Sequence, residues 1–120
     1  MQLLKRPLDL DSNGEYDALT DGLLLLRRMF GLTGDALVSG VIADNSAYPY
    51  PDDVERHFNI LDDLVDIDGD GSIDALTDGL VILRYLFGLR GEVLVGDVIS
   101  NNASRKSSAE VEARIELLVP

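Results

Sequence analysis

The chain has 120 residues, 46% of them hydrophobic, a formal net charge of −12 and no cysteine. The hydrophobic content supports a packed core in a chain of single-domain length, whereas the excess of acid disfavours nucleic-acid binding, which needs basic side chains against the phosphates. The lack of cysteine excludes disulfides and zinc–thiolate sites, and the apolar runs at 23–26 and 80–83 are too short for a membrane span.

The sequence consists of two copies of one unit. Asp9 corresponds to Asp66, 57 residues later, and the heptapeptide Asp-Ala-Leu-Thr-Asp-Gly-Leu occurs at the same place in both copies. The copies align without a gap. We therefore expect a single domain with pseudo-twofold organisation over residues 1–120, containing two repeats at 8–61 and 65–118.

Each unit begins with an Asp-rich loop and continues into a long apolar helix. Four apolar residues of the first unit recur at helical spacing and share one face: Leu19, Leu23, Leu26 and Phe30. Their equivalents in the second unit are Leu76, Leu80, Leu83 and Phe87. Further apolar residues between them indicate that much of each helix is buried. Gly31 and Gly88 follow as left-handed caps that end the helices.

Two shorter helices and a linker complete each unit. Paired apolar residues predict a short helix within 35–43, and the linker at 46–50 is predicted to pack its tyrosine rings on a neighbouring helix. The last helix begins at Pro51 in the first unit and after Ser107, which forms a capping box with Glu110, in the second. We expect three arginines to cap the C-terminal ends of the long helices: Arg27, Arg28 and Arg84. These elements predict an all-α fold.

The loops have the residue pattern of a calcium-binding turn. Calcium takes six to eight oxygens, which such a loop supplies from positions one, three, five, seven (a backbone carbonyl) and nine, with glycine at six. In the first loop these positions hold Asp9, Asp11, Asn13, Glu15 and Asp17, with Gly14 at six. In the second loop they hold Asp66, Asp68, Asp70, Ser72 and Asp74, with Gly71 at six. Calcium is the ion that this pattern predicts.

The residue that closes each loop is displaced by one position. EF-hand loops carry a bidentate glutamate at position twelve, but Thr20 and Thr77 stand there, and Asp21 and Asp78 follow. Because both copies keep this displacement, we expect Asp21 and Asp78 to close the loops through a one-residue extension, with the threonines capping the helices. Closure by Thr20 and Thr77 is the alternative.

The loop–helix pairs at 9–32 and 66–89 resemble the type I dockerins, which carry duplicated Asp/Asn-rich calcium loops, each followed by a helix. This resemblance implies that the calcium ligands include Asp9, Asp11, Asn13, Asp17, Asp66, Asp68, Asp70 and Asp74. Dockerins bind cohesin modules and attach secreted enzymes to scaffolds or cell surfaces. The resemblance therefore implies a cohesin-like or other surface protein as partner, and an extracellular or cell-surface setting in the C-terminal part of a larger protein. The repeat is longer than that of typical dockerins.

We predict a non-catalytic, EF-hand-like module that binds two calcium ions and whose folding is coupled to them. The second loop is expected to bind more tightly, because Asp70 replaces Asn13 and adds a charge. A calcium-stabilised structural spacer without a dedicated partner is the alternative. With no cysteine and His57 as the single histidine, zinc hydrolysis is excluded, and His57 is expected at the surface. A glycosidase would need a pair of catalytic carboxylates, but calcium binding already explains where the acids lie in the sequence.

Overall fold

The computed structural model describes residues 6–47 and 49–120, which form helices and loops and no β-strand. The prediction of an all-α fold is confirmed for these residues. In chain order the α-helices are α1 (Leu23–Met29), α2 (Gly34–Val38), α3 (Pro51–Leu61), α4 (Leu80–Leu86), α5 (Glu92–Val95) and α6 (Ser108–Glu116). The π-helical turns η1 (Ala18–Gly22) and η3 (Ala75–Gly79) run directly into α1 and α4, and the 3-10 turn η2 (Asp62–Val65) continues α3.

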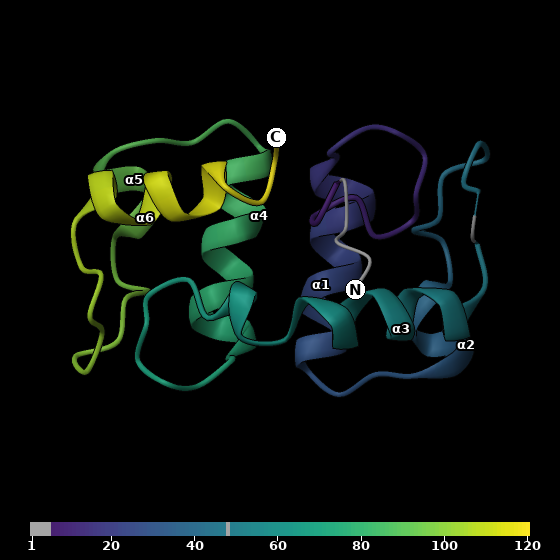
Figure 1. Cartoon of the computed structure of the whole chain (residues 1–120), viewed down its shortest axis with the longest axis horizontal. Helices are drawn as coiled ribbons and strands as arrows, with labels where there is room; N and C mark the ends of the chain where they lie inside the picture. The colour runs from purple at the N-terminus through teal and green to yellow at the C-terminus, as the bar shows by residue number, and fades with distance from the viewer. Residues whose placement is uncertain (1–5, 48) are drawn as a thin grey trace.

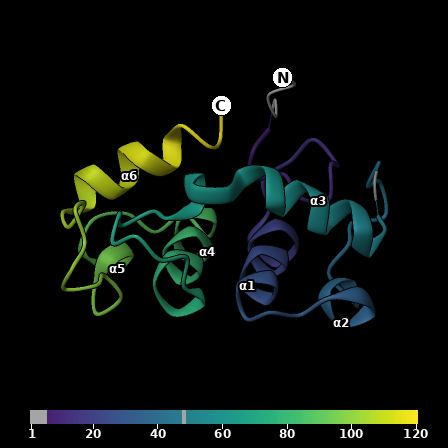
Figure 2. The ribbon, with the colours of Figure 1, turned by 60° about the horizontal axis from the view of Figure 1, so that its bottom comes forward.

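The helices α1 and α4 lie side by side at the centre of the molecule (Figure 1). Their contacts show that they run in opposite directions. The turn η1, which precedes α1, packs against α4, and the turn η3, which precedes α4, packs against α1. The helices α2 and α3 flank α1, and α5 and α6 flank α4 (Figures 1 and 2). Four buried side chains anchor the central pair in the core: Leu24, Leu25, Val81 and Ile82. No helix within the described ranges has the length and apolar character that crossing a membrane would require.

Two glycines allow the central helices to approach closely. A Cβ atom on Gly22 would lie 2.8 Å from Cδ1 of Leu83, and one on Gly79 would lie 2.8 Å from Cδ1 of Leu26. Side chains essentially never pack at such distances. The Asp-Gly pair that both copies share therefore serves two purposes, because the glycine admits the neighbouring helix and the aspartate before it faces the loop.

The buried face of the long helices is not the apolar stripe that the sequence predicted. Leu19 and Phe30 are 62% and 57% exposed, and their equivalents Leu76 and Phe87 are exposed to the same extent. The core is built instead on residues 24–25 and their equivalents, because α2 and α3 pack against that side of α1. Each central helix consequently keeps large apolar side chains at its two ends in solvent.

The predicted helix boundaries are largely confirmed. Pro51 is the first residue of α3, and Ser107 and Glu110 form the reciprocal hydrogen bonds of a capping box at the start of α6. Gly31 and Gly88, with φ values of +92° and +97°, end the long helices. The short helix α2 ends earlier than predicted, at Val38, because the chain turns at a left-handed glycine two residues later.

Arg27, Arg28 and Arg84 lie in the last turns of α1 and α4 as predicted, but the hydrogen bonds of Arg27 and Arg84 go to the neighbouring short helices. Arg27 Nη1 donates to the carbonyl oxygens of Leu37 and Ser39, at 3.3 and 2.8 Å, and so caps α2 rather than its own helix. Arg84 makes the equivalent bonds at the end of α5. The turn at Gly31 already satisfies the last carbonyls of α1, which leaves the arginine available to the next helix.

Two aromatic predictions also need correction. Tyr50, which was expected to pack its ring, is 68% exposed, while Tyr48 lies outside the described residues. His57 is half-buried rather than at the surface, with Nε2 located 2.7 Å from the carbonyl oxygen of Pro7. Burial lowers the pKa of His57. This histidine therefore ties the start of the described chain to α3.

Candidate metal centres

Hydrogen bonds to the first aspartate fold each Asp-rich loop. Asp9 Oδ2 accepts from the N–H of Gly14 at 2.8 Å, and Asp66 Oδ2 accepts from the N–H of Gly71 at 3.0 Å. Gly14 and Gly71 have φ values of +87° and +88°, a left-handed conformation that glycine adopts without a steric penalty. The glycine at position six thus turns the chain so that successive aspartates face one centre.

A π-helical turn brings the displaced aspartate of the first loop back to that loop. The N–H of Gly22 donates to the carbonyl of Asp17, five residues earlier, at 3.1 Å, and the second unit repeats this bond. A π turn holds one more residue than an α turn, so it absorbs the displacement. Asp21 Oδ1 then accepts from the N–H of Asp11 at 3.3 Å, and Oδ2 accepts from the N–H of Asp17 at 2.9 Å.

Asp78 takes the same place in the second loop. Its Oδ1 accepts from the N–H groups of Ile67 and Asp68, at 2.7 and 3.3 Å, and its Oδ2 accepts from the N–H of Asp74 at 2.9 Å. The hydroxyl of Thr77 lies 3.5 Å from Asp78 Oδ2. The threonine therefore contacts the closing carboxylate, and the aspartate reaches across the loop.

The carboxylates gather into two clusters whose oxygens lie within 4.8 Å of one another. The first consists of Asp9, Asp11 and Asp21, and the second of Asp66, Asp68, Asp70 and Asp78. Several are almost fully buried, and three oxygens are buried without a hydrogen-bond partner among the described residues: Oδ1 of Asp11, of Asp66 and of Asp68. Such oxygens are unfavourable unless a cation or a proton balances them. Both clusters can therefore hold a metal ion.

Burial and mutual repulsion oppose ionisation of the closing aspartates. Burial, and with it the charges of Asp11 and Asp9, raises the pKa of Asp21 to about 8. Burial, aided by the charges of its neighbours, raises the pKa of Asp78 to about 7. Without a cation, Asp21 is therefore mostly protonated and Asp78 partly protonated near neutral pH. A cation in either cluster would displace the proton.

Sequence reasoning missed a segment that covers each loop. After the short helix the chain returns, and the N–H of Ala43 donates to Asp11 Oδ2 at 2.9 Å. The N–H of Ser100 donates to Asp68 Oδ2 at 3.0 Å. We call these covering segments, 43–47 and 100–105, the clasps. Both copies carry a Val-Ile pair just before the clasp, which indicates that this part of the chain returns to the core. The pair does not indicate that a backbone N–H of the clasp would reach a carboxylate of the loop.

Several predicted ligands lie outside the two clusters. The acidic residues concerned are Glu15, Asp17 and Asp74, of which only Asp17 is half-buried. Asn13 Oδ1 accepts the N–H of Glu15 at 3.0 Å, and Asp70 Oδ1 accepts the N–H of Ser72 at 2.9 Å. These bonds fix the backbone at loop position seven, which Glu15 and Ser72 occupy. The ligand expected from this position is its backbone carbonyl, so the exposure of the Glu15 and Ser72 side chains is compatible with the predicted role.

The same contacts build both centres. The turn at position six, the closing carboxylate and the clasp each recur 57 residues later. No family model, no curated protein and no solved structure matches the chain. The assignment of function therefore rests on the geometry of these centres.

Proposed function

We propose that the protein is a non-catalytic calcium-binding module stabilised by two calcium ions. The observation that carries this proposal is the state of Asp11 and Asp68. Each is almost fully buried within a carboxylate cluster, and its Oδ1 has no hydrogen-bond partner among the described residues. Leaving a buried carboxylate uncompensated is strongly unfavourable. A cation at the centre of each cluster would compensate it.

The chemistry of the donors favours calcium over other cations. Both clusters offer only oxygen, which suits hard cations rather than zinc or copper. Three or four carboxylates, joined by the backbone carbonyls of Glu15 and Ser72 and by water, can supply the six to eight oxygens that calcium takes. Magnesium is usually bound through one or two carboxylates in a rigid octahedron, which matches these clusters less well.

In this proposal the units are EF-hand-like and are related by a pseudo-twofold axis between α1 and α4. The antiparallel packing of these helices and the contacts that recur in both copies support it. A calcium ion would bind the carboxylates of the loop and the closing aspartate, and the clasp would be held to them through its backbone N–H. Because the unfolded chain has no such assembled site, the binding free energy becomes folding free energy.

Calcium titration of the chelator-treated protein is expected to reveal two bound ions and a large gain in stability. At a free calcium concentration of 100 times Kd, each site adds about 2.7 kcal/mol, so the melting temperature should rise by more than about 10 °C. Calorimetry would give the stoichiometry, and circular dichroism would give the melting temperature. Absence of both heat and stabilisation would refute the proposal.

The second centre is expected to bind first, because its cluster has four carboxylates and the first has three. Substituting Asp70→Asn gives the second loop the amide that the first loop has in Asn13. The two affinities should then converge while the stoichiometry stays at two. If the affinity of the tighter site does not change on this substitution, the tighter site is the first loop and the prediction is wrong.

We further propose that the module attaches to a partner protein through the exposed apolar ends of its central helices. Leu19 and Leu76, at loop position eleven, are each 62% exposed, and Phe30 and Phe87 are each 57% exposed. Large apolar side chains left in solvent at the end of a helix offer contact surface for a partner. The partner would be a cohesin-like or other surface protein, and the setting would be extracellular or at the cell surface.

The alternative is a calcium-stabilised spacer without a dedicated partner. The N–H of Leu8 donates to the carbonyl of Leu118 at 3.2 Å, so residues near both ends of the described chain lie side by side. A spacer needs no exposed apolar contact surface, so the exposure of Leu19 and Leu76 favours attachment over spacing.

The double substitution Leu19→Ser and Leu76→Ser is expected to weaken binding to a cohesin-like module at least about 10-fold in calcium, because it removes apolar contact area at the proposed surface. Calorimetry against a panel of such modules would measure this effect. Val93→Ser is a matched control, since Val93 is 61% exposed but lies on α5. If no module binds, the spacer is the better description.

A further inference from the structure

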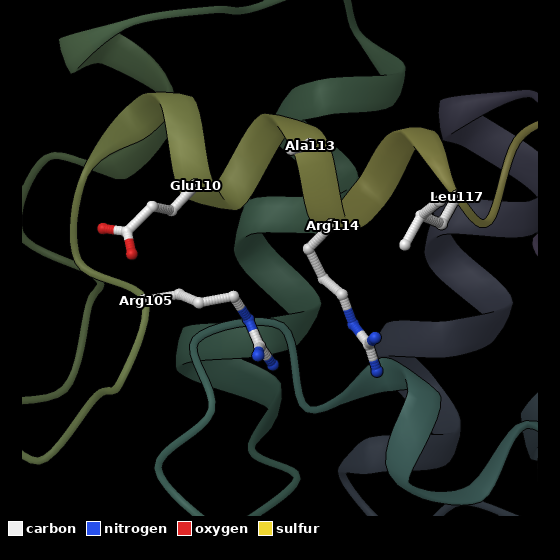
Figure 3. A pocket seen from close by; sticks show the side chains of 5 residues that line it. All are labelled: Arg105, Glu110, Ala113, Arg114 and Leu117. Carbon is white, nitrogen blue, oxygen red and sulfur yellow. The ribbon is translucent and has the colours of Figure 1, made fainter.

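An open hollow of about 320 Å³ lies beside α6. It borders the second Asp-rich loop, because Arg105, at the end of the clasp, contacts the backbone of that loop. Its lining combines two arginines, one acid and two apolar residues: Arg105, Glu110, Ala113, Arg114 and Leu117. Figure 3 shows both arginine side chains extending to the same side of α6, while Glu110 points away from Arg114. Two guanidinium groups side by side stand out in a chain of net charge −12.

Within the described residues, neither arginine forms an ion pair with an acid. Arg105 donates from Nε to the carbonyl of Ile67 and from Nη2 to the carbonyl of Asp66, both at 2.7 Å. Arg114 donates from Nη2 to the carbonyl of Leu64 at 3.3 Å. In the described part of the chain, the single ion pair lies elsewhere, between Arg56 and Asp53. Backbone carbonyls thus hold both guanidiniums in place without neutralising them.

Donor groups remain available on both arginines. The Nε of Arg114 is buried and has no hydrogen-bond partner, and Nη1 of each arginine donates no hydrogen bond within the described ranges. A buried donor without an acceptor is unfavourable, and two neighbouring positive charges repel each other. Burial and the charge of Arg105 accordingly lower the pKa of Arg114. One anion between the guanidiniums would relieve this repulsion.

We propose that this hollow binds a single carboxylate of a peptide, seated between Arg105 and Arg114, with an adjoining apolar side chain on Ala113 and Leu117. The guanidinium fork matches the two oxygens of a carboxylate. The carboxylate of Glu110 also lines the hollow and is held by Ser107. Its charge repels a phosphate dianion more strongly than a carboxylate with a single charge. Leu117 is 70% exposed and supplies the apolar surface.

The first unit lacks this pair of arginines. Its equivalents of Arg105 and Arg114 are Tyr48 and His57. The double substitution Arg105→Tyr and Arg114→His therefore replaces both guanidiniums with residues that the other copy carries at the same positions. This double substitution removes the proposed site with side chains that occur at the equivalent positions of the same protein.

The test is an NMR titration of the full chain in calcium with N-acetyl-leucine, which joins one carboxylate to one apolar side chain. We expect saturable shifts of the Nε–H signals of Arg105 and Arg114 and of the Leu117 amide, with millimolar affinity. The neutral N-acetyl-leucinamide should bind at least about 10-fold more weakly. N-acetyl-Leu-Glu-amide offers only a side-chain carboxylate, and comparison of the two acids identifies whether the chain terminus or a side chain is the preferred source.

Equal responses to the acid and the neutral amide would overturn the proposal, as would tighter binding of inorganic phosphate at the same signals. These comparisons use the unmodified protein and do not depend on the fold of a variant. The double substitution should abolish the shifts, and Arg56→Gln, at an exposed arginine outside the hollow, should leave them unchanged. Retention of binding by a folded double variant would also overturn the proposal.

Discussion

Replacing Asp78 with asparagine is expected to weaken calcium binding at the second centre about 100-fold, or about 2.7 kcal/mol. The amide keeps an oxygen that can accept the N–H of Ile67, which the carboxylate accepts at 2.7 Å, but it removes the charge that faces the ion. In chelator the substitution should lower the melting temperature much less than it does in calcium, because burial raises the pKa of Asp78 to about 7 and the carboxyl is already partly protonated there. The loss that remains reflects the N–H of Asp74, which the amide nitrogen cannot accept. Calorimetry and melting curves, each in calcium and in chelator, would measure both effects.

The matched control is Thr77→Val, which removes a hydroxyl and preserves the branched shape. Thr77 Oγ1 lies 3.5 Å from Asp78 Oδ2, so its loss should change calcium affinity by no more than about twofold. The opposite pattern, in which the valine variant loses affinity and the asparagine variant keeps it, would assign loop closure to the threonine. Equal losses from both substitutions would indicate general damage to the loop.

The loops were the most predictable part of the molecule because their signals are local. A glycine at position six must turn the chain, and Gly14 and Gly71 do so at positive φ. Pro51 and the Ser107–Glu110 pair likewise act within one helical turn and mark their helix starts as predicted. Each of these residues determines the backbone within a few positions, without reference to the rest of the chain.

The parts that could not be predicted depend on distant segments. The displaced Asp21 was a recognisable anomaly, but only the π turn ending at Gly22 explains how its carboxylate returns to the loop. That glycine also admits Leu83 of the neighbouring helix. The clasp bond from Ala43 to Asp11 spans 32 residues. Helical spacing identified an apolar stripe, yet packing by α2 and α3 decided which face became core.

The dependence of stability on pH is expected to reverse its sign when calcium is removed. In chelator the folded protein holds protons on Asp21 and Asp78, whose pKa values are about 8 and about 7, whereas an unfolded aspartate has a pKa of about 3.9. Stability from these carboxyls is complete below the unfolded value and is lost as the pH rises through 7 and 8. The melting temperature in chelator should therefore fall by at least about 4–8 °C between pH 5 and pH 9, the change that about 1 kcal/mol produces.

In calcium the ion replaces both protons, so acidification competes with binding and the melting temperature should rise from pH 5 to pH 7. Calcium binding near pH 6 should also release protons, which calorimetry detects as a dependence of the binding heat on the ionisation enthalpy of the buffer. The double substitution Asp21→Asn and Asp78→Asn removes the titrating carboxyls and should flatten the slope in chelator. A slope of unchanged size in that variant would place the titration on other groups, and a melting temperature that rises with pH in chelator would contradict the protonation of buried aspartates as the cause.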